Sequence, residues 1–193
     1  MGTPDSGTTI GPLPLDQVDR CRALRLRALG EHPEAFGQTY AEAMQLSPDE
    51  VRTRAETVWT HADNQVFVAV TAESSFVGTL WVSREPRERE RHRAHVWGVY
   101  VAPEARSQGI ARRLLAAAIA WCRSLDGVLQ MHLSVAANNA PAIRVYHEAG
   151  FTWCGRTPRT WILDGQALDQ DHMVLMLDGY PWNIDQHRKG PAS

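Results

Sequence analysis

The chain has 193 residues and a formal net charge of −2. This length suits one domain with its own hydrophobic core, and the near-neutral charge gives no general attraction for the phosphates of nucleic acid. The longest apolar runs, such as residues 114–122, fall well short of the ~20 residues of a membrane-spanning helix, so we expect no membrane partner.

The ends of the chain differ from its middle. Residues 1–9 are polar and glycine-rich, without the basic start and apolar stretch of a secretory signal, so we expect a cytoplasmic protein. We predict a flexible N-terminus over residues 1–9, one packed domain over 10–177 and a polar tail over 178–193. Cys21, Cys122 and Cys154 lack metal-ligand spacing, which predicts reduced thiols and no metal site.

The first half of the chain predicts two helices followed by a hairpin. Apolar residues recur every three or four positions from Val18 to Leu29, which indicates a helix that begins near Asp16 and ends before Pro33. Ser47 followed by a proline and two acidic residues is typical of a helix start, and this second helix should reach residue 59. Residues 66–70 and 76–82 are rich in β-formers and flank a polar turn, so they predict two paired strands.

The next segment, residues 84–93, holds five arginines, three glutamates and Pro86. Because the signs alternate, we interpret it as a solvated loop rather than a nucleic-acid surface. Residues 95–101 then predict a third strand. Alternation along an extended strand would place His95 on the same side as Trp97, Val99 and Val101.

The second half predicts helices at residues 111–125 and 139–149, closed by Gly127 and Gly150. Strands are predicted at residues 129–135, within 151–163, and at 171–177. The order of elements favours an α/β (α+β) layout in which helices pack on a mixed sheet. The strands at residues 95–101 and 129–135 should be parallel, because a helix connects them.

The junction after the third strand carries the clearest chemical signal. A strand, a tight loop and a helix start follow one another over residues 99–115. The first amides of a helix lack partners and carry partial positive charge, so such a junction can bind a diphosphate. Gly109 and Ala111 allow close approach to the backbone, and Arg106 and Arg112 can add charge. The glycine motifs of dinucleotide and nucleoside-triphosphate sites are absent from the sequence.

Two motifs in this region resemble those of the GNAT superfamily of N-acetyltransferases. Arg106-x-x-Gly109-x-Ala111 is similar to the family's R/Q-x-x-G-x-G/A signature, and the segment from Asn139 through Tyr146 to Gly150-Phe151 is similar to its later motif. The resemblance covers residues 67–177. It implies a mixed, mostly antiparallel twisted sheet flanked by helices, with a parallel, splayed central strand pair. It also implies transfer of the acetyl group of acetyl-CoA to a primary amine by direct attack in a ternary complex.

The resemblance further assigns residues to the cofactor. The exposed backbone of the third strand would pair with the pantetheine arm, the amides of the loop and helix start would cradle the diphosphate, and Asn139 would hydrogen-bond the arm. Val99 and Val101 could instead be core residues, and Asn139 could serve as a helix N-cap alone. The cofactor residues implied are Val99, Tyr100, Val101, Arg106, Ser107, Gln108, Gly109, Ile110, Ala111, Arg112, Asn139, Ala142 and Tyr146.

Acetyl transfer also needs an acid and a base. Tyr146 matches the family's frequent general acid, which protonates the departing thiolate, although a tyrosine on an amphipathic helix can also be a core residue. His95 stands where some members carry a catalytic glutamate, and a neutral histidine can accept a proton at pH 7. Glu34 or an ordered water are the alternatives.

The acceptor pocket is predicted to draw on Glu34, Phe36, Tyr40 and Trp161, whose aromatic and acidic groups suit a cationic amine. The sequence does not name that amine. A non-catalytic acyl-CoA-binding regulatory module is the alternative function, because the family's glutamate is replaced. A homodimer is also left open.

Overall fold

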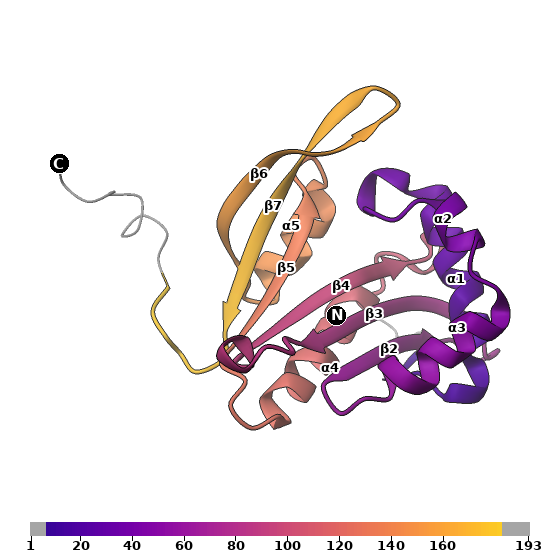
Figure 1. The fold of residues 1–193 in the computed structure, drawn as a ribbon, viewed down its shortest axis with the longest axis horizontal. Helices are drawn as coiled ribbons and strands as arrows, with labels where there is room; N and C mark the ends of the chain where they lie inside the picture. Colours follow the sequence, from indigo (N-terminus) through magenta and orange to yellow (C-terminus); the bar gives the residue numbers. More distant parts are fainter. Residues whose placement is uncertain (1–6, 183–193) are drawn as a thin grey trace.

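The computed structural model describes residues 7–182, which contain a seven-stranded sheet flanked by helices (Figure 1). The strand order is β1-β2-β3-β4-β5-β7-β6, and the pairs are antiparallel except for β4 with β5. The strands are β1 (Thr9–Pro12), β2 (Asn64–Val70), β3 (Phe76–Arg84), β4 (Arg93–Val101), β5 (Gln130–Ala136), β6 (Thr152–Leu163) and β7 (Gln166–Met176). The predicted fold class and the predicted parallel pair are confirmed.

The helices cover both faces of the sheet. Gly78 of β3 faces Ile110 and Leu114 of α4, whereas Trp81, three residues further along the strand, packs with Cys21 of α1. Residues three apart on a strand point to opposite faces, so α1 and α4 lie on opposite sides of β3. The helices are α1 (Val18–Glu31), α2 (Tyr40–Met44), α3 (Pro48–Arg54), α4 (Ile110–Ser124) and α5 (Ala140–Glu148).

Most predicted elements are found within a few residues of their expected bounds. The helix predicted at Ser47 begins with a capping box, in which the Ser47 side chain and the Glu50 carboxylate bond each other's backbone amides, and a π-helical turn (Ala55–Trp59) extends it. Strand β1 and helix α2 were not predicted. β1 has four residues, two of them glycine and proline, and α2 has five, so neither is long enough for a periodic signal.

The predicted ends lie largely outside the described residues, which exclude 1–6 and 183–193. Of the described N-terminal residues, Thr8 is buried and Thr9 begins β1, which pairs with β2. None of the helices in residues 7–182 combines the length and the hydrophobicity that crossing a bilayer requires. In the predicted loop, Arg84 and Arg91 both contact Asp63, and Arg87 lies 3.7 Å from Glu90, so several of these charges are paired within the chain.

The sheet splits between β4 and β5. Their parallel register runs from Arg93 to Val96 and stops there, so the rest of β4 is paired with β3 alone. A bulge lies at the same place: Trp97 is opposite Trp81, but Tyr100 is opposite Thr79. Gly98 makes the bulge possible, because its φ is +63° and an added Cβ would lie 2.4 Å from the Trp81 ring.

The bulge corrects the predicted alternation along β4. His95, Trp97 and Tyr100 lie opposite Ser83, Trp81 and Thr79, which share one face of β3. Val101 lies opposite Gly78, on the other face. The prediction that His95 and Val101 share a side is therefore wrong, because the extra residue in the bulge reverses the order of faces.

Candidate active site

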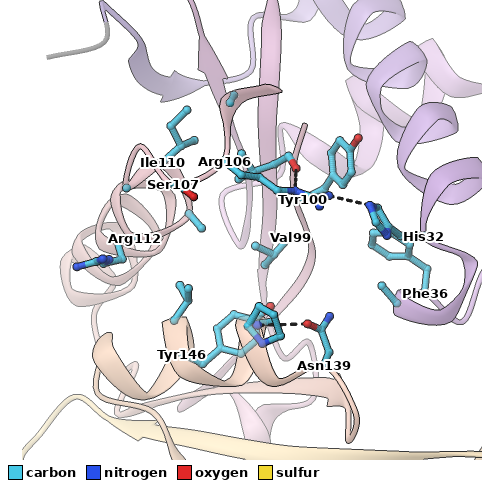
Figure 2. Close-up of a pocket in the computed structure, with 18 of the residues that line it drawn as sticks. His32, Phe36, Val99, Tyr100, Arg106, Ser107, Ile110, Arg112, Asn139 and Tyr146 are labelled. Carbon is cyan, nitrogen blue, oxygen red and sulfur yellow. Dashed lines mark hydrogen bonds between the residues drawn. The ribbon is translucent and has the colours of Figure 1, made fainter. Parts of the chain in front are cut away.

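A cavity of about 690 Å³ opens where β4 leaves β5. Figure 2 shows its three walls: Arg106, Ser107 and Ile110 at the start of α4, Asn139 and Tyr146 on α5, and His32 and Phe36 after α1, with Val99 of β4 between them. Twelve of the thirteen residues predicted to hold the cofactor line this cavity. The exception is Gln108, whose exposed side chain turns back to the carbonyl of Glu104.

The wall formed by α4 presents main-chain amides. Ser107 and Gly109 both adopt left-handed backbone conformations, with φ of +63° and +75°, and Gly109 is the N-cap of the helix. Among the described residues, the backbone amides from Ser107 to Arg112 have no hydrogen-bond partner in the chain, and the first such bond in the helix runs from Arg113 to Gly109. A loop of this shape concentrates partial positive charge and is suited to an anion.

The arginine side chains near these amides are already engaged. The Arg106 Nε donates to the Val101 carbonyl at 3.0 Å, and its Nη2 donates to His32 Nε2 at 2.7 Å. Arg112 lies 3.2 Å from Glu148. Because arginine can only donate, His32 Nε2 must accept, and the His32 Nδ1 proton then donates to Glu34 at 3.1 Å. Arg106 therefore links the end of β4 to the segment after α1.

The wall formed by α5 carries Asn139 and Tyr146. The Asn139 carboxamide oxygen caps the helix by accepting from the Ala142 amide at 3.2 Å, which leaves its NH₂ group as a donor. Tyr146 is buried and makes an edge contact with Phe151, with ring centroids 6.3 Å apart. Burial raises the pKa of the Tyr146 phenol, so it stays protonated at neutral pH.

Only some of the residues predicted as general base or acceptor pocket lie at the cavity. Glu34 and Phe36 line the cavity, whereas His95, Tyr40 and Trp161 do not. His95 lies beside His132 of β5 on the face that also carries His172. Burial lowers the pKa of His95; the Glu85 carboxylate partly offsets this, and Arg93 and His172 make smaller contributions that lower the pKa further. Tyr40 is exposed on α2, and Trp161 lies near the end of the β6–β7 hairpin.

Gly98 at the bulge and His32 in the cavity wall are among the residues of this region that were not singled out from the sequence. An isolated glycine inside a strand pattern indicates a bulge, so Gly98 did carry a signal. His32 carried none, because its bonds to Arg106 and Glu34 depend on how α1 packs against the loop before α4.

Comparisons with known proteins agree with this geometry. A model of the acetyltransferase (GNAT) family matches residues 31–151. The mycothiol acetyltransferase of Brachybacterium faecium is 30% identical over 154 residues, which are 77% of this chain and 43% of that enzyme. The chain spans about half the length of the curated relatives it matches.

Solved structures share the fold. An acetyltransferase of the GNAT family from Streptococcus pneumoniae superposes with a TM-score of 0.79 at 17% identity, over 88% of this chain and 98% of that one. A GNAT superfamily phosphinothricin acetyltransferase from Sinorhizobium meliloti, solved in complex with acetyl-CoA, superposes with a TM-score of 0.76 at 21% identity, over 88% of each chain.

Proposed function

Because the chain belongs to the acetyltransferase (GNAT) family, we propose that it transfers the acetyl group of acetyl-CoA to a primary amine. The amine would attack the thioester directly while both substrates are bound. One observation carries the proposal: the one-sided stretch of β4 after Val96 and the unpartnered amides from Ser107 to Arg112 border the same cavity. The first can pair with the pantetheine amides as an added strand, and the second can hold the diphosphate.

The separation of β4 from β5 also leaves a backbone amide available to stabilise the negative charge that develops on the thioester carbonyl oxygen. If the pantetheine follows β4, the thioester reaches the bulge at residues 98–99, where the ladder of strand hydrogen bonds is interrupted. The Val99 amide is our candidate donor to the oxyanion of the tetrahedral intermediate.

Tyr146 is our candidate acid for the departing thiolate. The raised pKa of the phenol keeps its proton in place until it is needed. Desolvation beside the buried phenol would also raise the pKa of a thiol, because both groups are anions once deprotonated. The two pKa values therefore shift in the same direction, so burial does not by itself oppose proton transfer from the phenol to the thiolate.

The base must take a proton from the amine on the other side of the thioester. Glu34 is better placed than His95, because its carboxylate borders the cavity and is held by His32. An ordered water between Glu34 and the amine would serve equally well in this arrangement. We also propose a cytoplasmic location, and sedimentation of the purified protein would decide whether it forms the homodimer that the sequence left open.

Two measurements test the proposed function. Calorimetry should detect binding of coenzyme A. When the protein is incubated with acetyl-CoA and a panel of amines, at least one amine should cause release of the free thiol of coenzyme A. A non-catalytic acyl-CoA-binding module would bind coenzyme A and release none; the buried Tyr146 in the cavity favours turnover over that alternative. Absence of any binding to coenzyme A or acetyl-CoA would exclude both functions.

A further inference from the structure

A second, smaller cavity of about 220 Å³ lies on the face of the sheet that α1 covers. Its walls come from α1, the segment through α2 and α3, and the strands β3 and β4. The residues that characterise it are three arginines and three tryptophans, namely Arg22, Arg25, Arg54, Trp59, Trp81 and Trp97.

Several buried N–H groups of the residues in these walls have no hydrogen-bond acceptor in the described part of the chain. Arg25 Nη2 donates to the Gln38 side chain at 3.3 Å, but its buried Nη1 has no acceptor. Arg22 Nη2 donates to the Leu46 carbonyl at 2.6 Å, but its buried Nε has none, and the same is true of Trp81 Nε1. Guanidinium and indole groups cannot accept a hydrogen bond. The cavity is thus lined with buried donors for which residues 7–182 supply no acceptor.

The charge of the cavity points the same way. Three guanidinium groups line it, and among the described residues no aspartate or glutamate does. Burial lowers the pKa of Arg25 to about 10, so the group is still charged at neutral pH and bears the cost of desolvation. Its positive charge stacks on the rings of Phe36 and Trp81, at 4.4 and 5.9 Å from their centroids. An anion in this cavity would supply the missing acceptors and offset that cost.

This cavity adjoins the larger one. Phe36 lines the larger cavity and lies under the Arg25 guanidinium, which lines the smaller one. On β4, Val99 borders the larger cavity and Trp97 the smaller, with the bulge at Gly98 between them. A small molecule that occupied the second cavity would therefore extend its other end towards the bulge.

We propose that the second cavity is the recognition site for a carboxylate on the acceptor, which is a primary amine that also carries a carboxylate group. The inference rests on the proposed function for the amine end, and it replaces the cationic acceptor expected from Glu34 and the aromatic residues. A carboxylate fits because its two oxygens match the fork of donors on arginine. The tryptophans then contact the apolar body of the molecule.

The first experiment measures binding without acetyl transfer. Phenylacetate and phenylacetamide differ in charge but hardly in shape, and Trp59, Trp81 and Trp97 report on the cavity by their fluorescence. Phenylacetate should give a saturable change with a dissociation constant about 10- to 100-fold lower than that of phenylacetamide, which is the usual range for a hydrogen bond to a charged partner. Equal affinities, or no saturable change with phenylacetate, would overturn the inference.

Matched variants locate the effect. Arg25→Gln and Arg54→Gln should each reduce the preference for phenylacetate by about tenfold. Arg54 is exposed, so its replacement tests the site even if Arg25→Gln lowers stability. Arg52→Gln is the control, because Arg52 lies on α3 outside the cavity and pairs with Asp19 and Asp49. An equal loss of preference in Arg52→Gln would show only a general effect of surface charge and would sink the inference.

The second experiment connects the cavity to turnover. Thiol release from acetyl-CoA is compared for L-phenylalanine and L-phenylalaninamide, and for L-methionine and its amide. The acids should have the higher kcat/KM, through a lower KM, although the amides have less basic and therefore more often neutral amines. If the amides are acetylated as well as the acids, the proposed function stands and the carboxylate site is wrong. If coenzyme A does not bind at all, the proposed function fails while the fluorescence result still decides on the cavity.

Discussion

The two cavities on either side of the bulge in β4 differ in the kind of donor they offer. The larger one presents the main-chain amides from Ser107 to Arg112, and the Arg112 side chain beside them is paired with Glu148. The smaller one presents guanidinium and indole groups from elements far apart in the sequence. A site made of backbone depends on the shape of a loop, whereas a site made of side chains depends on the identity of each residue.

The difference matters for specificity. Amides at a helix start bind any suitable diphosphate, so this part can stay constant while acceptors change. Under our proposal, the side chains of Arg25 and its neighbours in the smaller cavity select the acceptor. Substitutions should therefore separate into two groups, those that alter the loop or the chemistry and those that alter the choice of amine.

The largest effect should come from Tyr146, the proposed general acid in the larger cavity. Tyr146→Phe should lower kcat by about 100-fold or more with an accepted amine, because a general acid typically contributes 10²–10⁴-fold. The KM for acetyl-CoA should change little, since the ring remains. Rates of thiol release under saturating acetyl-CoA measure this, and the melting temperature serves as a control for folding. A variant as fast as the wild type would assign Tyr146 to the core alone.

The next largest effect should follow from removing the bulge that separates the cavities. Gly98→Ala places a Cβ within 2.4 Å of Trp81 at a φ of +63°. Overpacking and a left-handed alanine together should cost about 2–4 kcal/mol, which thermal unfolding would detect. Gly155→Ala is the matched control, because a Cβ there meets no atom within 4 Å. Equal stability of the two variants would mean that β4 accommodates a side chain at the bulge.

A smaller effect tests whether the cofactor is bound by backbone or by side chain. Gly109→Ala adds a Cβ at a φ of +75°, in open space beside the proposed diphosphate site, and should weaken coenzyme A binding about tenfold by distorting amide contacts. Arg112→Gln removes a charge that is already paired with Glu148 and should change the dissociation constant by less than about threefold. Calorimetric titration measures both, and the reverse order would mean that side-chain charge dominates.

The same contrast explains how far the sequence predicts this protein. The larger cavity could be predicted from a short run of residues, because the strand, the loop around Gly109 and the helix start are consecutive in the chain. Asn139 and Tyr146 follow from the second local motif. The smaller cavity could not be predicted, because α1, α3 and β3 meet there only through tertiary packing. The bulge at Gly98 lies between these cases: the glycine is visible, but its reversal of the faces of β4 required the register with β3.

The smallest predicted effect concerns pH and lies in neither cavity. The amides and guanidinium groups that line the two cavities do not titrate near neutrality. Stability should nevertheless fall in acid, because burial, together with Arg93, His95 and His92, lowers the pKa of His132 from 6.5 to about 4.

The sign follows from linkage. The unfolded chain takes up the His132 proton near pH 6.5 and the folded chain only near pH 4, so stability is complete above pH 6.5 and is lost as the pH falls towards 4. His132 is partly accessible to water, which reduces the effect. Replacement of His132 by glutamine should reduce the fall in melting temperature between pH 6.5 and 4 by about 2–4 °C. His147→Gln, on the exposed side of α5, is the control. If the two variants lose stability equally between pH 6.5 and 4, the acid sensitivity has another origin, and the depressed pKa of His95 on the neighbouring strand is the next group to remove.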